Sequence, residues 1–266
     1  GTIDGAADNE GTLQITGTLK TFSNNIGSTY YLSLIDIDTN VTFSGNVTTY
    51  RLQLGADIID SGDIIVEGPS TIETDIVSQG PQIYNGDITI TTNVSLDSNN
   101  NKITFNGTVN SESSEANTLT IDVGSSEVEF NGIVGGALNG GLGAIDITGA
   151  LNLDAAITSA ASLTVSTTSN LAADVTTTGT QTYGDGISSG AVVLSTDVTL
   201  TTTDSNITFN DTVRSDSSDT PRDLTINLDA NSNGTTADLI INGIVGGASL
   251  PLDVITITGD LDLNSS

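Results

Sequence analysis

The feature that most constrains this chain is a long internal repeat. Three phrases return in the same order about a hundred residues later: GPQIY at 80–84 returns as GTQTY at 179–183, ITFNGTV at 103–109 as ITFNDTV at 207–213, and NGIVGGA at 131–137 as the same seven residues at 242–248. The spacing between matching phrases grows from 99 to 111 residues while their order is kept. Such drift is typical of a repeat unit that accepts insertions in its loops.

The repeat predicts how the chain is organised. We expect one continuous solenoid domain over 1–266, with a partial copy at 1–79, a full copy at 80–178 and a third copy at 179–266. Residues before 80 are assigned to an earlier copy because VTFSGNV at 41–47 matches VEFNGIV at 128–134. We expect the chain to be a window from a longer array of such copies.

Apolar and small polar residues alternate strictly within each copy, as in LTIDV at 119–123, LTINL at 224–228 and ITIT at 255–258. A period of two places the aliphatic side chains on one face of a β-strand and the polar ones on the other. Paired strands of this kind recur about every 15 to 25 residues, which is the length of one solenoid coil. No segment shows the period of a helix.

Two all-β architectures accommodate these strands. Tandem Ig-like β-sandwiches need about seven strands per copy, a bulky core and an exposed linker at each boundary. This chain has no Trp, and no Pro-rich stretch lies near residue 80 or 179. A solenoid also accepts lateral loop insertions without disturbing the stacking of its coils. We therefore predict a right-handed parallel β-helix and keep the tandem sandwiches as the alternative.

Each copy also contains a short phrase of the form Phe-Asn-Gly-x-Val, for example at 105–109 and 130–134. We interpret it as a strand, a tight bend at Asn-Gly and a second strand. The expected reason for Asn and Gly is that both accept the left-handed backbone angles of a tight bend.

Composition excludes several functions. The chain has 33 acidic and 5 basic residues, a formal charge of -28, and no Cys, His, Met or Trp. It therefore lacks a thiol nucleophile and an imidazole base. The negative charge repels nucleic-acid phosphates and anionic lipid, so we expect neither as a partner. No apolar run approaches the length of a membrane span, so we also expect no membrane insertion. Carboxylates and amide carbonyls are hard oxygen ligands, which makes Ca²⁺ the expected cofactor.

The repeated phrases resemble the β-strand repeats of very large bacterial surface adhesins, of the filamentous-haemagglutinin and autotransporter-passenger kind. The resemblance covers essentially the whole chain and rests on GPQIY at 80–84, ITFNGTV at 103–109, LTI at 119–121 and NGIVGG at 131–136. It implies export to the cell surface or the extracellular space and a structural or adhesive role as a stalk or filament-forming module. The implied partners are like modules, packed end to end or laterally, and host-cell or matrix glycans. No catalytic residues are implied, and we expect no enzymatic activity.

One loop matches the first half of a calcium-binding loop. In DANSNG at 229–234, the side chains of Asp229, Asn231 and Asn233 alternate, and Gly234 follows where the chain must turn sharply. These three residues are the predicted metal ligands. The acid that normally closes such a loop is missing, because the twelfth position is Ile240 and Asp238 comes two residues early. The alternative is a solvated turn rich in Asn and Asp.

A weaker match to calcium β-rolls lies at 139–146 (NGGLGAID), where the acid comes one place late. Acid pairs at Asp36 and Asp38, and at Asp57 and Asp60, raise the alternative of a polysaccharide-cleaving β-helix enzyme. Polar residues on a solvent face are the simpler interpretation.

Threonines also recur two residues apart, as at 118–120, 199–201 and 256–258. Rows of this kind can stack into a flat surface that binds ice, although β-strand propensity alone accounts for many of them.

Overall fold

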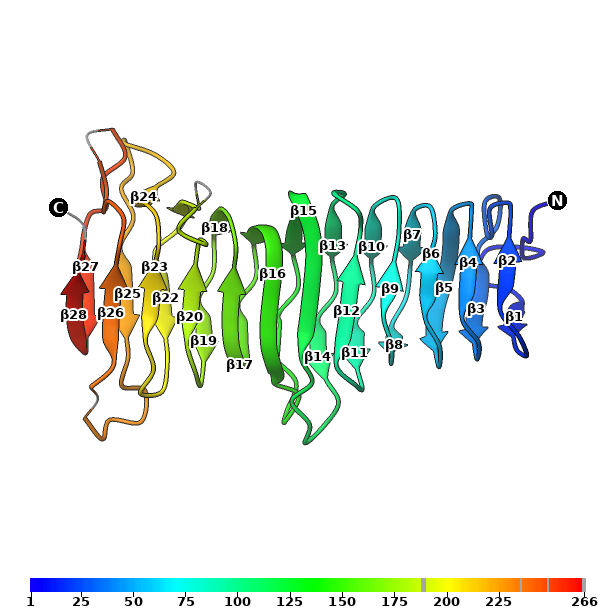
Figure 1. Ribbon diagram of the computed structural model, residues 1–266, viewed down its shortest axis with the longest axis horizontal. Helices are drawn as coiled ribbons and strands as arrows, with labels where there is room; N and C mark the ends of the chain where they lie inside the picture. The colour runs from blue at the N-terminus through cyan, green and yellow to red at the C-terminus, as the bar shows by residue number, and fades with distance from the viewer. Residues whose placement is uncertain (188–189, 235, 248, 265–266) are drawn as a thin grey trace.

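The computed structural model describes residues 1–187, 190–234, 236–247 and 249–264, and they form an elongated stack of β-strand coils (Figure 1). All named strand pairs are parallel, and a strand pairs with the strand that occupies the same face of the next coil. No helix occurs among the described residues, so none of them forms a helix long and apolar enough to cross a membrane.

The coils have three faces, which we number in the order in which the chain visits them. The first face contains the first half of β5 (Val47–Leu54), β7 (Ile64–Val66), β10 (Gln82–Tyr84), β13 (Ile103–Phe105), the second halves of β15 (Leu119–Phe130) and β16 (Leu142–Leu153), β18 (Ser169–Leu171), β21 (Val192–Leu194) and β24 (Val213–Ser215).

The second face contains β1 (Thr12–Ile15), β3 (Leu32–Ile37), the second half of β5, β8 (Ser70–Ile72), β11 (Ile88–Ile90), β14 (Val109–Ser111), the start of β17 (Ile157–Val165), β19 (Val175–Thr177), β22 (Val198–Thr201), β25 (Leu224–Asn227) and β27 (Ile255–Thr258).

The third face contains β2 (Lys20–Phe22), β4 (Val41–Phe43), β6 (Ile58–Asp60), β9 (Ile76–Val77), β12 (Val94–Asp97), the first halves of β15 and β16, the end of β17, β20 (Gln181–Tyr183), β23 (Ile207–Phe209), β26 (Asp238–Ile241) and β28 (Asp260–Leu263).

This architecture confirms the predicted parallel β-helix. The alternative of tandem Ig-like sandwiches is wrong, because those sheets are antiparallel. Among the described residues, only one bridge is antiparallel, and it joins Thr203 to Asp229.

The alternating sequence fills the interior of the coil. In β13, for example, Ile103 and Phe105 are buried and Thr104 between them is half-buried on the outside. Because parallel strands stack in register, each inward side chain lies on an inward side chain of the next coil. The result is one continuous apolar core along the stack.

Aromatic rings form short ladders inside this core. Tyr84, Phe105 and Phe130 stack on the first face, with ring centroids 5.1 Å apart at both steps. On the third face, Phe22 stacks on Phe43 at 5.3 Å, and Tyr183 stacks on Phe209 at 5.4 Å. Each such pair stabilises a fold by about 0.5–1.5 kcal/mol beyond the area that it buries.

The Gly-x-Gln-x-Tyr phrase places a hydrogen-bonded polar pair in the interior. Gln82 and Tyr84 are both fully buried, and the Tyr84 hydroxyl donates to Gln82 Oε1 at 2.8 Å. The Gln82 amide donates to Ser78 Oγ at 3.0 Å and to the Asp97 carbonyl at 2.9 Å. Burial raises the pKa of Tyr84, so the hydroxyl stays protonated and remains a donor.

The next copy repeats this pair on a different face. Tyr183 donates to Gln181 Oε1 at 3.0 Å, but Gln181 belongs to the third face, whereas Gln82 belongs to the first. The first pair lies in β10 on the first face, and four full turns later that face is occupied by β18. The second pair lies in β20, which comes two faces after β18, on the third face. One sequence repeat is therefore not a whole number of turns, and equivalent residues rotate around the axis from copy to copy.

The Asn-Gly bends form corners between faces, but the expected reason for their glycines is wrong. Neither Asn106 nor Gly107 has a positive φ. Instead, a Cβ on Gly107 would lie 2.4 Å from the carbonyl carbon of Gly86, and a Cβ on Gly132 would lie 2.1 Å from the Gly107 oxygen. Successive corners approach so closely that a side chain does not fit between them.

The recurrence of NGIVGGA ends at Ala248, which lies outside the described residues, as do Ser265 and Ser266 at the end of the third copy. The boundaries of the three copies remain a prediction from the sequence.

We predict that Gly107→Ala destabilises the coil stack by about 1–3 kcal/mol, the usual cost of overpacking. Gly55→Ala is the matched control, because its Cβ would meet only the Ile37 carbonyl oxygen at 3.5 Å and the Asp38 Oδ1 atom at 3.7 Å. Urea unfolding followed by circular dichroism compares the two variants. Equal midpoints would show that the corners do not depend on close contact.

Candidate functional site

The predicted calcium loop is a tight turn between β25 and β26. Asp229 accepts hydrogen bonds from two backbone N–H groups of its own loop, Asn233 at 3.0 Å and Gly234 at 3.1 Å. The Asn231 side-chain oxygen accepts from the same Asn233 N–H at 3.3 Å. The structure thus brings all three predicted ligands together, and local hydrogen bonds already engage oxygens of Asp229 and Asn231.

The structure adds a fourth candidate oxygen ligand, Asp204, which the sequence pattern missed. Asp204 lies one coil earlier, and its Oδ2 atom accepts from the Asn231 amide at 2.7 Å and from the Asn233 amide at 3.3 Å. A motif written along the chain does not detect it, because stacking of the coils alone brings residue 204 beside residue 231. No group of three or more acidic side chains that could hold a metal occurs among the described residues.

Calcium binding to this loop remains a prediction with a direct test. We expect a higher melting temperature in millimolar CaCl₂ than in NaCl of equal ionic strength, because a ligand that binds only the folded state stabilises it. The gain is about 1.4 kcal/mol when the free calcium concentration is ten times its Kd. Asp229→Asn should reduce the gain, whereas Asp219→Asn, the same change at an exposed loop position, should not. Equal melting temperatures after chelator treatment would contradict calcium binding.

In the second predicted calcium loop, at 139–146, the oxygen-bearing side chains do not lie together. Asn139 lies in the loop before β16, whereas Asp146 lies within β16, in register with Thr120 and Thr164 on the outer surface of the third face.

The acid pairs also have structural partners. The Gln14 amide donates to Asp36 Oδ2 and to Asp38 Oδ2, each at 3.2 Å, and so links the two carboxylates to the preceding coil. Asp57 accepts a hydrogen bond from the Thr74 hydroxyl. Asp60 differs, because its Oδ1 atom is buried and no described residue donates a hydrogen bond to it. That the chain is not an enzyme stays a prediction.

A more general contact recurs at corners along the rod, in which an Asp or Asn side chain accepts the backbone N–H of a corner residue one coil later. The acceptor and donor pairs are Asp4–Thr29, Asn25–Asn46, Asn46–Asp63, Asp75–Ser95, Asp87–Thr108, Asn93–Thr118, Asn100–Ser125, Asn110–Ala137, Asp174–Thr199, Asp197–Asp223, Asn206–Asp238 and Asp223–Val254. We call the acidic members corner carboxylates. They satisfy N–H groups that the strand ladders leave unpaired.

A related carboxylate, Asp211, links coils in the opposite direction. It accepts the N–H of Thr212 at 2.6 Å and that of Gly190, one coil earlier, at 2.8 Å. These two backbone hydrogen bonds lower the pKa of Asp211 below its ordinary value of 3.8. Asp211 occupies the position that Gly107 has in the preceding copy.

We predict that Asp211→Asn lowers the melting temperature at pH 7, because a hydrogen bond to a charged acceptor is weakened, at a cost of about 1 kcal/mol. A carboxylate whose pKa is lowered by folding stabilises the protein above its unfolded pKa, and this stability is lost as the pH falls through the folded pKa. The difference between variant and parent should therefore be largest above pH 3.8 and shrink below it. A difference that does not change with pH would contradict the assignment. Asp219→Asn serves as the control.

A small ion cluster lies on the outer surface of the first face. Lys102 Nζ contacts Glu127 at 2.8 Å and Glu129 at 3.1 Å. Burial raises the pKa of Glu129, but the hydrogen bond and charge of Lys102 outweigh it, and the net shift is downward. Exposed pairs of this kind contribute at most about 1 kcal/mol, so the cluster is a minor part of the stability.

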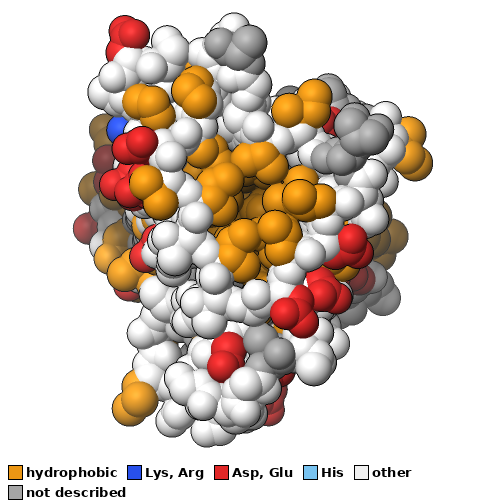
Figure 2. All heavy atoms as spheres, turned by 90° about the vertical axis from the view of Figure 1, so that its left-hand side faces the viewer, with side chains coloured by type: hydrophobic (Ala, Val, Ile, Leu, Met, Phe, Trp, Pro, Cys, Tyr) orange, Lys and Arg blue, Asp and Glu red, His pale blue; other side chains and the backbone are white. Residues whose placement is uncertain are grey.

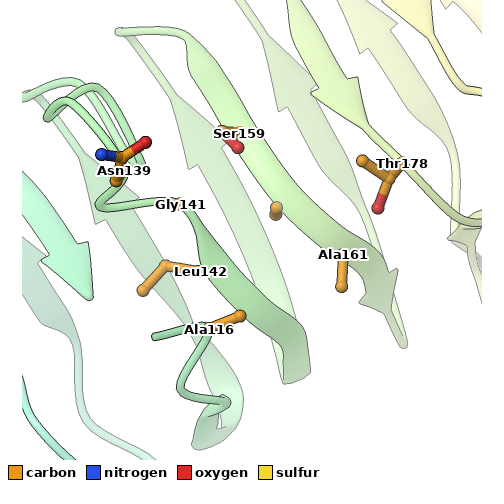
Figure 3. Close-up of a pocket in the computed structure, with 8 residues that line it drawn as sticks. Ala116, Asn139, Gly141, Leu142, Ser159, Ala161 and Thr178 are labelled. Carbon is orange, nitrogen blue, oxygen red and sulfur yellow. The ribbon is translucent and has the colours of Figure 1, made fainter. Parts of the chain in front are cut away.

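A shallow pocket of about 230 Å³ lies on the third face, where the loop before β16 meets β17 (Figure 3). Small or polar residues line it together with one larger apolar side chain, that of Leu142; the others are Ala116, Asn139, Gly141, Ser159, Ala160, Ala161 and Thr178. No acidic or basic side chain is among them, so this lining offers no pair of groups for acid–base chemistry.

Comparison with models of protein families, with curated proteins and with solved structures finds no match.

Proposed function

We propose that this chain is a rigid structural segment of a cell-surface or extracellular protein, where it acts as a stalk or filament-forming module. The observation that supports the proposal is the uninterrupted stack from β1 to β28 (Figure 1). About twelve turns, spaced by about 4.8 Å as neighbouring strands are, give a rod of roughly 55 Å. Loops that vary between copies leave the sides of the rod and do not interrupt it.

Contacts along the axis support the rigidity of this rod. Besides the strand ladders and aromatic stacks, the Asn106 amide donates to Asn85 Oδ1 at 2.6 Å, and the Asn131 amide donates to Asn106 Oδ1 at 2.7 Å. The ladder continues the Tyr84–Phe105–Phe130 stack on the outside of the coil, since each Asn directly follows a ring. A bend of the rod would have to break several such contacts at once.

The repeated phrases support the proposed location, since they resemble adhesin repeats of exported bacterial proteins. In such a protein a rod holds a binding tip away from the surface, and the proposed partners are host-cell or matrix glycans and like modules.

The C-terminal coil supports end-to-end packing of like modules. Leu261 and Leu263 of β28 and Ile255 of β27 are 48%, 60% and 39% exposed. Figure 2 shows that apolar side chains gather in the middle of this end of the rod. Among the described residues, β28 pairs with β26, and an unpaired strand edge accepts a further strand, from a following coil or from another molecule.

Spin labels test the rod directly, because the chain has no native Cys. Thr42→Cys and Thr208→Cys place labels on the outer surface of β4 and β23, eight turns apart along β4–β6–β9–β12–β15–β16–β17–β20–β23. We expect one narrow distance distribution between the two backbone positions near 40 Å, from about 4.8 Å per turn. A broad or multiple distribution would contradict a rigid spacer. Sedimentation of the unlabelled chain at rising concentration measures end-to-end association separately.

A further inference from the structure

We propose that the outer surface of the second face, in the C-terminal half of the rod, binds ice. The surface consists of the outward residues of β19, β22, β25 and β27, which we call the threonine strip: Thr176, Thr199, Thr201, Thr225, Asn227, Thr256 and Thr258. This activity goes beyond the spacer role and does not depend on it.

The strip is a two-dimensional array rather than a set of scattered threonines. One row is Thr199, Thr225 and Thr256, and the other is Thr176, Thr201, Asn227 and Thr258, each in register on successive strands. Neighbours within a row are about 4.8 Å apart, and the two rows are about 6.7 Å apart, because they lie two residues apart along each strand. Two fixed spacings suit a ligand that is itself periodic in two directions.

Three of the four strands, β19, β22 and β25, hold their part of the array rigidly from behind, whereas the inward Ile255 of β27 is 39% exposed. The inward neighbours Val198, Leu200, Leu224 and Ile226 are at most 2% exposed. Threonine is β-branched and has few side-chain rotamers, so its hydroxyl and methyl groups keep their positions. Along one edge, the corner carboxylates Asp174, Asp197 and Asp223 hold successive coils together.

The outer surface of the strip carries hydroxyl, methyl and amide groups and no charge. In a chain with a formal charge of -28, none of these seven outward positions carries a charge. None of the described residues hydrogen-bonds the hydroxyls of Thr176, Thr199, Thr201, Thr225, Thr256 or Thr258. The hydroxyls therefore remain available to hydrogen-bond water, while the methyl groups between them restrict the orientation of the adjacent water.

Ice fits these properties better than a polysaccharide does. The strip has no aromatic ring on which a sugar could stack and no charged group to anchor an anionic one. Its regular hydroxyls and methyls instead order a layer of water at fixed spacings, and that layer can merge with the surface of an ice crystal.

The whole chain tests the proposal by thermal hysteresis and by inhibition of ice recrystallisation. We expect activity in the parent chain and at least a tenfold loss in Thr225→Lys, which places a bulky charge at the centre of the array. Thr208→Lys is the matched control, because Thr208 is likewise half-buried on the outside of a central strand, between Thr182 and Ile240 on the third face. It should keep full activity.

Circular dichroism and melting confirm that both variants fold. A parent chain without ice activity, or equal losses in the two variants, would overturn the proposal. Binding of the parent chain to powdered cellulose or chitin, lost in Thr225→Lys without any effect on ice, would assign the strip to polysaccharide and overturn the ice proposal as well.

Discussion

Hydrogen bonding between successive coils is the interaction on which the rest of this structure depends. Parallel pairing places each residue on a residue of the same orientation one coil later, so inward side chains stack on inward ones. Rings therefore meet rings at about 5 Å, Asn amides meet Asn amides outside them, and corner glycines meet corner glycines. Each of these ladders follows from the register of the strands.

Some of the many acidic side chains have a structural role, because they accept backbone hydrogen bonds from the next coil. A corner of a β-coil leaves backbone N–H groups without a strand partner, and a short carboxylate or amide one coil away accepts them. Like charges on adjacent coils repel each other, which opposes this gain. The acids therefore combine a local stabilising contact with a long-range cost, and bound cations would reduce that cost.

Sequence repeats and structural turns follow different periods in this chain. The buried pair Gln82 and Tyr84 lies on the first face, and its counterpart Gln181 and Tyr183 lies on the third. The pair fits on either face because the surroundings of an inward side chain are similar on both. In each case the side chain lies between inward side chains of the preceding and the following coil. This equivalence of faces lets loops change length between copies. It also makes each face different on the outside, and the two rows of the threonine strip lie on the second face.

The sequence by itself determined the strands, the solenoid and the inward residues, because alternation with a period of two and repeats with drifting spacing admit few other folds. It also located the loop of Asp229, Asn231 and Asn233. Only the tertiary structure decided what lies beside what across coils. It placed Asp204 against that loop and showed that Gly107 is needed for close contact rather than for a left-handed turn. It also aligned Thr199, Thr225 and Thr256 into one row. The physical reason is that these contacts join residues 20 or more positions apart, and their partners depend on loop lengths that set the register of each coil.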